Sequence, residues 1–242
     1  MLESQWKNGR ESAVQLSKLF EERGLKGCRV LDVPCGIGRV SVPLAKLGYE
    51  VVGVDISPYF VQLAKEKARQ FGVAKRATFR VGSMKEVGSL FPRPQFDAAM
   101  NIFTSIGFGS EKDDLVFFRG LRQVVKKGGL FVIDRLANRD FITSHFCPHL
   151  YQETDQLLVL ETNEMDLSRS RLKSNWRFYQ KRDGSLKYVV KSNVELRLYS
   201  PHELVTMLAG AGWKVSGVYD SLSKRGPFSS HSLGMSLVAE AI

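Results

Sequence analysis

The sequence predicts an α/β fold in which a mostly parallel, seven-stranded sheet is covered by helices on both faces. Short apolar runs alternate with helical patterns up to Asp134, which is typical of βαβ units. A second observation is the glycine-rich turn Gly36-Ile-Gly38, which follows the first apolar run and opens a helical pattern. A third is the change after Asp134 to longer alternating stretches, which predict antiparallel strands.

Helix start signals support the elements of the first half of the chain. Ser57-Pro58 reads as an N-cap followed by a proline at the first helical position, and Ser110 to Asp113 reads as a capping box. Together with the apolar periodicity, these signals predict helices at residues 9–24, 40–47, 57–71 and 110–125. The apolar runs predict strands at residues 28–33, 50–55, 77–81, 96–101 and 129–134.

A β-rich insertion is expected at residues 140–199, within a single domain that spans residues 1–242. A hairpin turn is predicted at Asp183-Gly184, between the last two strands of the insertion. These strands are expected at residues 157–166, 171–182 and 186–198. Because the insertion leaves the fifth strand and returns the chain to the last helix, we expect it to cover the crevice as a substrate cap.

The helical alternation resumes after the insertion. Ser200 carries capping signals for a helix that is expected to run to Gly210 or Gly212. Two further strands are predicted at residues 213–219 and 232–241, and the last of them is expected to run antiparallel to the others.

Composition excludes several classes of protein. With 43% hydrophobic and 25% charged residues over 242 positions, the chain is typical of globular proteins and not of disordered ones. It has no run of roughly 18 apolar residues and no signal-peptide core, so we expect a cytoplasmic protein without a membrane partner. The irregular spacing of Cys28, Cys35 and Cys147 predicts neither a disulfide framework nor a metal site.

The turn at Gly36 and Gly38 is suited to binding an anionic group, because glycines let a ligand approach the backbone and a helix N-terminus presents unpaired N–H groups. Asp55, at the end of the second strand, can accept hydrogen bonds from both hydroxyls of a ribose. A dinucleotide is disfavoured because Ser41 replaces the third glycine and Asp32 would repel a pyrophosphate. Asp32 instead favours an ammonium or sulfonium group, and S-adenosylmethionine carries both.

Four segments in the right order resemble motifs of class I S-adenosylmethionine-dependent methyltransferases. They are Val30 to Arg39, Val51 to Pro58, Phe96 to Asn101 and Leu121 to Asp134. The resemblance covers residues 28–134 and implies a Rossmann-like fold with S-adenosyl-L-methionine as the cofactor. The insertion resembles the branch that methylates N or O atoms of small molecules.

The resemblance also implies which residues hold the cofactor. Gly36, Gly38, Asn101 and Ile102 would lie beside the methionine part, with Asp32 on its ammonium group. The ribose would be held by Asp55, the adenine by Ile56 and the Ser83-Met84 turn, and Trp6 and Arg10 would close over the cofactor. The predicted cofactor-binding set is therefore Trp6, Arg10, Asp32, Gly36, Gly38, Asp55, Ile56, Ser83, Met84, Asn101 and Ile102.

Methyl transfer depends mainly on holding the nucleophile, methyl carbon and sulfur in line, so no catalytic residue is assigned. Acceptor contacts are expected at the crevice ends of the strands and on the insertion. The substrate-side candidates are Phe103, which begins the stretch to Phe108, Arg135, which begins the stretch to Arg139, Trp176 in the insertion and His231 before the final strand.

Charge leaves two other functions open. The net charge is +10, and eight cations but only Asp183 as an acid lie within residues 169–191. Arg171, Lys173 and Arg177 alternate with apolar side chains and should share one face of a strand. That face could bind an anionic acceptor or RNA, or be a solvated outer face that contributes to an oligomer. We predict a small-molecule methyltransferase; an RNA methyltransferase and a non-catalytic S-adenosylmethionine-binding protein are the alternatives.

Overall fold

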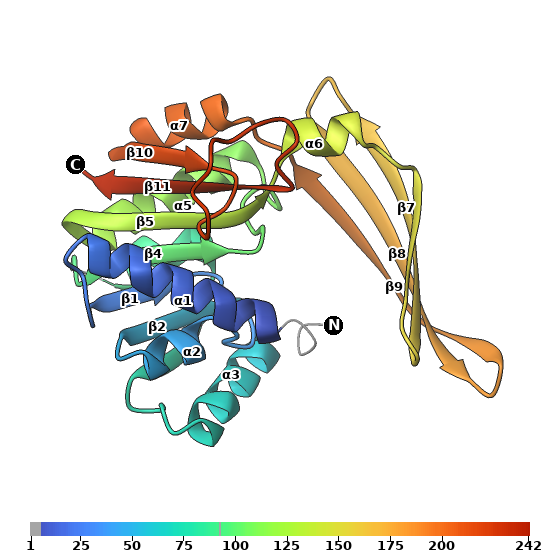
Figure 1. Ribbon diagram of the computed structural model, residues 1–242, viewed down its shortest axis with the longest axis horizontal. Helices are drawn as coiled ribbons and strands as arrows, with labels where there is room; N and C mark the ends of the chain where they lie inside the picture. The colour runs from blue at the N-terminus through green and yellow to red at the C-terminus, as the bar shows by residue number, and fades with distance from the viewer. Residues whose placement is uncertain (1–5, 92) are drawn as a thin grey trace.

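The computed structural model describes residues 6–91 and 93–242 and confirms the predicted α/β architecture (Figure 1). A seven-stranded sheet has the order β10-β11-β5-β4-β1-β2-β3, and β11 is antiparallel to both of its neighbours. Its strands are β1 (Arg29–Asp32), β2 (Glu50–Asp55), β3 (Ala77–Val81), β4 (Phe96–Ile102), β5 (Val125–Ala137), β10 (Trp213–Tyr219) and β11 (Gly234–Ala241).

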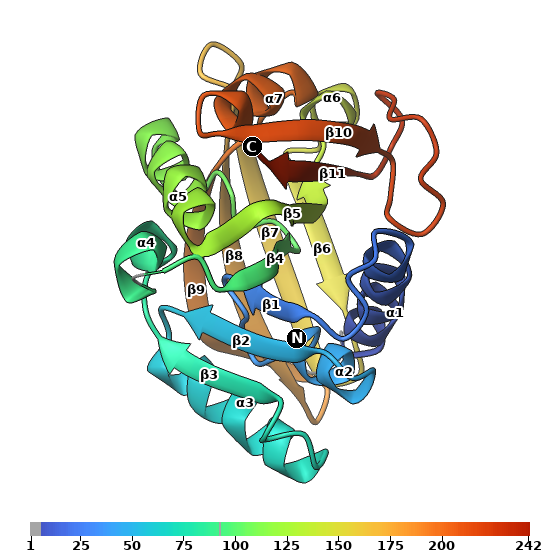
Figure 2. The ribbon, with the colours of Figure 1, turned by 90° about the vertical axis from the view of Figure 1, so that its left-hand side faces the viewer.

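Helices cover both faces of this sheet (Figure 2). One face packs against α1 (Trp6–Glu22), α2 (Ser41–Lys46) and α3 (Pro58–Gln70). The other packs against α4 (Val87–Leu90), which follows the short 3-10 helix η1 (Met84–Glu86), and against α5 (Glu111–Val124) and α7 (Pro201–Ala209). The predicted caps are present, since the hydroxyls of Ser57, Ser110 and Ser200 accept hydrogen bonds from the first turns of α3, α5 and α7.

Two apolar clusters hold the sheet between its helices. Phe117, Phe131 and Trp213 are fully buried in the cluster under α5 and α7, while Leu16 and Phe20 of α1 are fully buried in the other. Each such side chain contributes roughly 1.5–3 kcal/mol to the free energy of folding through burial. The carboxyl ends of the parallel strands are therefore fixed on a rigid base.

A second sheet, which we call the cap, is formed by the insertion and has the order β6-β7-β8-β9. Its strands are β6 (His149–Glu153), β7 (Leu157–Asp166), β8 (Arg171–Arg182) and β9 (Ser185–Arg197), preceded by α6 (Arg139–Ser144). Asp183 and Gly184 both have positive φ, as the predicted hairpin turn requires. In Figure 1 the cap stands beyond the ends of β4 and β5, and Figure 2 shows its strands behind the central sheet.

Some boundaries differ from the prediction. Helix α1 begins at Trp6, and β5 begins at Val125, directly after α5, with a register shift against β4. The sequence indicated neither α6 nor β6. All five residues of β6 are exposed, so it lacks the apolar alternation that marks a half-buried strand, and α6 is too short to show helical periodicity.

Candidate cofactor and acceptor site

A cavity of about 530 Å³ lies at the carboxyl edge of the central sheet. This volume lies within the range of small-molecule sites. Its walls come from the end of β1 with the glycine turn, the end of β2, the start of η1 and the end of β4. Seven of the predicted cofactor residues meet there: Asp32, Gly36, Asp55, Ile56, Ser83, Met84 and Ile102.

Asp55 ties the glycine turn to the end of β2. Its Oδ2 accepts a hydrogen bond from Gly36 N at 2.8 Å, and its Oδ1 accepts one from Ser57 N at 2.9 Å. Each carboxylate oxygen has a second lone pair, so the cavity-lining side chain can still accept bonds from a ligand. A ribose diol fits this arrangement.

The two glycines of the turn serve different purposes. Gly36 lines the cavity at φ +52°, and a Cβ built on it would meet nothing within 4 Å, so its missing side chain leaves space for a ligand. Gly38, at φ +77°, lies away from the cavity lining, and its Cβ would stand 3.2 Å from Phe79 Cζ and 3.3 Å from Ala64 Cβ. Gly38 therefore lets α3 and β3 pack closely against the turn.

Asp32 is a buried carboxylate at the cavity wall. Burial raises its pKa to about 7, with the nearby Asp55 adding to the rise, while the hydrogen bond from Ser41 and the charge of Arg39 oppose it. The Ser41 hydroxyl donates to Asp32 Oδ2, which explains why serine stands where a dinucleotide site has its third glycine. An ammonium group in the cavity would stabilise the ionised form of Asp32.

The adenine side has an exposed apolar contact and a polar turn. Ile56 is 72% exposed on the cavity wall, so a flat ligand lying on it would bury apolar surface. The hydroxyl of Ser83 caps η1 by accepting from Lys85 N at 3.3 Å. The Ser83 oxygen has a second lone pair that an adenine amino group could use, and this contact stays a prediction.

Four predicted cofactor residues lie away from this cavity. Besides Gly38, these include Trp6 and Arg10, which line a separate hollow between α1 and α2, where the Trp6 ring stacks on Phe71 with 5.9 Å between centroids. The sequence could not show that Phe71, directly after α3, would pack against Trp6. Asn101 is fully buried, and its Nδ2 donates to Val33 O at 2.7 Å. This hydrogen bond ties the end of β1 to the neighbouring strand β4.

Arg39 is a cavity residue that the sequence analysis missed. Its guanidinium lies 3.7 Å from the ring centre of Phe103, and Arg135 lies 5.2 Å from the same ring. Phe103, Thr104 and Arg135 all have φ between +48° and +69°, which is uncommon for residues other than glycine and clusters at functional sites. The only sequence signal for Arg39 was its position directly after Gly38.

The other substrate-side candidates are dispersed. Trp176 is half-buried in β8 and contacts Phe178, with 6.3 Å between ring centroids. His231 lies in an exposed turn, where Ser230 Oγ is 3.3 Å from its Nδ1. Neither residue lines the cavity, so only Phe103 meets the cofactor candidates directly, with Arg135 packed against it.

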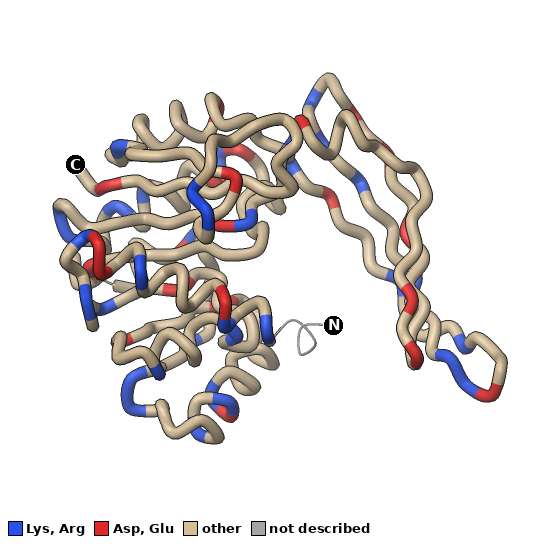
Figure 3. Tube along the Cα trace, viewed as in Figure 1, with Lys and Arg blue, Asp and Glu red and all other residues tan. Residues whose placement is uncertain are grey.

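The cations of the cap are accompanied by acids from the neighbouring strands (Figure 3). Arg171 pairs with Glu195 at 3.3 Å and Lys181 with Glu153 at 2.8 Å. Residues 140–199 hold nine Lys and Arg against eight Asp and Glu, so the insertion as a whole is almost neutral. Cations and apolar side chains alternate along β8 as expected. The acids of the neighbouring strands, however, leave the cap with far less net charge than β8 alone indicated.

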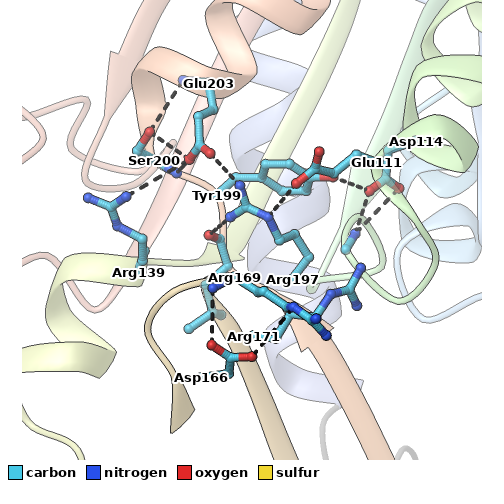
Figure 4. Close-up of polar contacts among 12 residues, drawn as sticks. Glu111, Asp114, Arg139, Asp166, Arg169, Arg171, Arg197, Tyr199, Ser200 and Glu203 are labelled. Carbon is cyan, nitrogen blue, oxygen red and sulfur yellow. Dashed lines mark hydrogen bonds and ion pairs between the residues drawn. The ribbon is translucent and has the colours of Figure 1, made fainter.

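A polar network joins the cap to the loop after β4 (Figure 4). Arg197, at the end of β9, pairs with Glu111 at 2.8 Å and also with Glu203 of α7. Its backbone N–H donates to Gly107 O at 2.8 Å, and a Cβ on Gly107 would come within 2.3 Å of Arg197 O. Tyr199 donates to Asp114 at 2.7 Å, so the cap is fixed to α5 and α7.

Comparison with known proteins agrees with this architecture. Residues 30–129 match the family model of a methyltransferase domain. The CcbJ methyltransferase from Streptomyces caelestis superposes with a TM-score of 0.82 at 22% identity, covering 97% of this chain and 89% of that one. The CalS10 amino pentose methyltransferase from Micromonospora echinaspora gives a TM-score of 0.73 at 16% identity, covering 100% and 97%. The fold is therefore that of the Rossmann-like methyltransferases.

Sequence relatives match less than half of the chain. A ubiquinone biosynthesis O-methyltransferase from Azorhizobium caulinodans is 32% identical over 114 residues, which is 47% of this chain and 42% of the relative. A magnesium-protoporphyrin O-methyltransferase from Rhodobacter capsulatus is 40% identical over 82 residues, or 33% and 35%. The chain thus spans about two fifths of the length of these relatives. The match to the methyltransferase family model covers residues 30–129, which include every residue that lines the cavity.

Within residues 6–91 and 93–242, no group of three or more His, Cys, Asp or Glu side chains is arranged to hold a metal ion. No helix in the same residues is long and apolar enough to cross a membrane.

Proposed function

We propose that the protein uses S-adenosyl-L-methionine to methylate an N or O atom of a small-molecule acceptor. The observation that carries this proposal is the cavity in which Gly36, Asp32 and Asp55 meet. It provides space beside the backbone, a carboxylate for an ammonium group and a carboxylate for a ribose, in the order that this cofactor requires.

When bound, S-adenosylmethionine would supply a methyl group to a lone pair of the acceptor, with S-adenosylhomocysteine as the leaving group. The chain's own contribution is positioning. Asp55 and the Gly36 backbone fix the nucleoside end, Asp32 fixes the amino acid end, and the Phe103 loop borders the side from which an acceptor would approach. A proton acceptor is needed only for an acceptor that must lose a proton in the reaction.

A small acceptor is supported by the names of the similar proteins. Two of them act in ubiquinone biosynthesis and on magnesium-protoporphyrin, and a third is an amino pentose methyltransferase. The cap adds a second argument, because it stands beyond the strand ends where a substrate wall would lie (Figure 1). We therefore retain residues 140–199 as a substrate cap within one domain, with Trp176 as a candidate wall residue.

The contacts of the cap cations favour the small-molecule proposal over the RNA alternative. Arg171 is paired with Glu195 and also donates to Gly109 O at 3.3 Å, so it serves to join the cap to the loop before α5. Lys173 has Glu164 and Glu195 as its neighbours on both adjacent strands. These acids reduce the surplus of cations that an RNA platform would need.

Two further parts of the proposal concern location and assembly. A cytoplasmic location remains a prediction from the sequence. Self-association through the insertion is supported by β9, an edge strand on which Leu186, Tyr188, Val189 and Val190 are each at least 50% exposed.

A labelled methyl transfer assay tests the function. The protein is incubated with S-adenosylmethionine carrying a radioactive methyl group and with a cell extract, with and without nuclease or protease. We expect label in small molecules that survive both treatments, and much less label with the Asp55→Ala variant. Label lost on nuclease treatment would favour the RNA methyltransferase, and binding of the cofactor without any transfer would favour the non-catalytic protein.

A further inference from the structure

A second cavity of about 360 Å³ lies beside the cofactor cavity, between α1, the end of β5 and the loop after β10. Apart from Arg135, the residues that line it have no role in the proposed function. Its polar walls are formed by Glu11 and Ser12 of α1, Asp134 and Arg135 of β5, and Asp220 after β10. Three carboxyl groups and one guanidinium thus line this space.

Asp134 is the most buried of the three acids. Its side chain is 5% exposed, and its Oδ1 accepts a hydrogen bond from Ser236 at 2.6 Å. Arg135 Nε is 3.8 Å from Oδ2, but the Arg135 guanidinium also lies over the Phe103 ring and is 45% exposed. Burial raises the pKa of Asp134, while hydrogen bonds from Ser236 and from the backbone of Leu222 and Arg135, with the charge of Arg135, lower it. A cationic group in the cavity would further stabilise the ionised form of Asp134.

Ser12 gives an independent indication of a ligand. It is 2% exposed, lines the cavity, and its Oγ has no hydrogen-bond partner among the described residues. Buried hydroxyls are nearly always paired, because losing water without a replacement bond is costly. A donor placed in this cavity would satisfy the Ser12 oxygen.

The second cavity adjoins the first across a single turn of chain. Phe103 lines the cofactor cavity and its backbone N–H donates to Asp134 O at 3.0 Å. Arg135 lines the second cavity and its carbonyl accepts from Thr104 Oγ1 at 2.9 Å. A molecule held in the second cavity therefore lies next to the residues that border the cofactor.

We propose that the second cavity binds a protonated amino group of the methyl acceptor, so that the substrates of this enzyme are amines. The proposal rests on the proposed function and names its substrate class. An ammonium group has three donors and no acceptor, which suits Asp134, Asp220 and the unpaired oxygen of Ser12. An anionic acceptor would face three carboxyl groups there.

The test compares the binding of three probes that share a cyclohexane ring and differ in their polar group. Cyclohexylamine, cyclohexanol and cyclohexanecarboxylate are titrated by NMR at pH 7 into the full chain saturated with S-adenosylhomocysteine. We expect the amine to bind most tightly and Asp134→Asn to weaken it roughly tenfold, as loss of a charged hydrogen bond does. Asp220→Asn and Ser12→Ala should also weaken it, whereas Asp183→Asn, the same charge change in the hairpin turn, should leave it unchanged.

Three results would overturn the proposal: equal binding of the amine and the alcohol, tighter binding of the carboxylate, or equal affinities in the cavity variants and Asp183→Asn. If Asp134→Asn fails to fold, Asp220→Asn removes the same charge at a half-buried position and decides the question. Calorimetry with S-adenosylhomocysteine distinguishes failure of this inference from failure of the proposed function. Cofactor binding without amine preference refutes this inference alone, and absence of cofactor binding refutes the proposed function.

Discussion

The phenol of Tyr199 donates a 2.7 Å hydrogen bond to Asp114 Oδ2, and both residues are buried. Asp114 also accepts from the backbone N–H of Gly107 at 3.1 Å. The carboxylate therefore links three segments: the chain leaving the cap, helix α5 and the loop after β4. Burial raises the pKa of Asp114, and these two hydrogen bonds oppose the rise.

Replacing Tyr199 by Phe should lower the free energy of unfolding by about 1–2 kcal/mol, because it leaves a buried carboxylate with one donor fewer. Urea denaturation measures the effect. Tyr151→Phe removes the same hydroxyl from a tyrosine that is 69% exposed on β6 and should change stability by less than about 0.5 kcal/mol. Equal losses of unfolding free energy in the two variants would show that the hydrogen bond to Asp114 does not stabilise the fold.

Asp55→Ala should weaken S-adenosylmethionine binding by roughly 1.5–3 kcal/mol, since it removes charged hydrogen bonds to the ribose. It also leaves Gly36 N and Ser57 N without their acceptor, so the glycine turn itself should loosen. Calorimetry measures the affinity, with Asp155→Ala in an exposed cap turn as the control. Unchanged affinity in Asp55→Ala would refute the assigned ribose contact.

Gly36→Ala should impair mainly cofactor binding, whereas Gly38→Ala should impair mainly the stability of the fold. Gly36→Ala places a methyl group in the cavity and should abolish cofactor binding, with a stability cost of about 1–2 kcal/mol from its positive φ. Gly24→Ala has the same strain, with open space around it and no cavity nearby, and should retain binding. Gly38→Ala should be less stable than either, because it collides with Phe79 and Ala64.

Thermal melts and calorimetry on the same three variants separate strain from occlusion. Retained cofactor binding in Gly36→Ala would mean that the open space beside Gly36 is not where the ligand lies. A melting temperature for Gly38→Ala equal to that of Gly24→Ala would show that the contacts with α3 and β3 relax without cost.

Cofactor affinity should rise with pH through the titration of Asp32, whose pKa is about 7. Only the carboxylate pairs with an ammonium ligand, so the affinity for S-adenosylhomocysteine should increase roughly tenfold between pH 6 and pH 8. Asp32→Asn should bind more weakly and show a flat profile. A wild-type profile that is also flat would mean that Asp32 does not face the ammonium.

The same shift has the opposite sign for folding. The folded-state pKa of Asp32 is raised from 3.8 to about 7, so the folded state holds its proton more tightly than the unfolded state. This contribution to stability is complete below about pH 4 and is lost as the pH rises through 7. Asp32→Asn should therefore lose less stability than wild type on going from pH 5 to pH 8, measured by urea denaturation.

The exposed cations of β8 and β9 separate the small-molecule enzyme from the RNA enzyme. Replacing Lys173, Arg177 and Lys191 by Gln leaves the Arg171 contacts in place. The variant should retain its cofactor affinity and most of its turnover. RNA binding, measured by fluorescence anisotropy across a salt series, should have the same salt dependence as wild type, whereas a flatter slope would mean that these residues contact phosphates.

The sequence predicted the central sheet well because its signals are local. The caps at Ser57, Ser110 and Ser200 and the turn at Asp183-Gly184 each need only three or four neighbouring residues. The exposed strand β6 carried no such signal, since an edge strand without a buried face has no period to detect.

The lining of the cavity was predictable where a strand end or the glycine turn marks a residue, as with Asp55 and Asp32. It was not predictable where a residue's partner lies far along the chain. Gly38 is explained by Phe79, and Trp6 by Phe71, and neither contact can be read from spacing. The balance of charge in the cap was missed for the same reason, because the acids that pair with β8 come from β6 and β9.

The placement of β11 between β5 and β10 has a consequence for folding kinetics. The ladder joins Ala137 to Gly234 and spans the whole cap, so it is a pairing of high contact order. Hairpins within the cap form between neighbouring strands and shorten the effective loop that the ladder must close. We expect the cap to collapse early and the C-terminal strand to lock into the central sheet late.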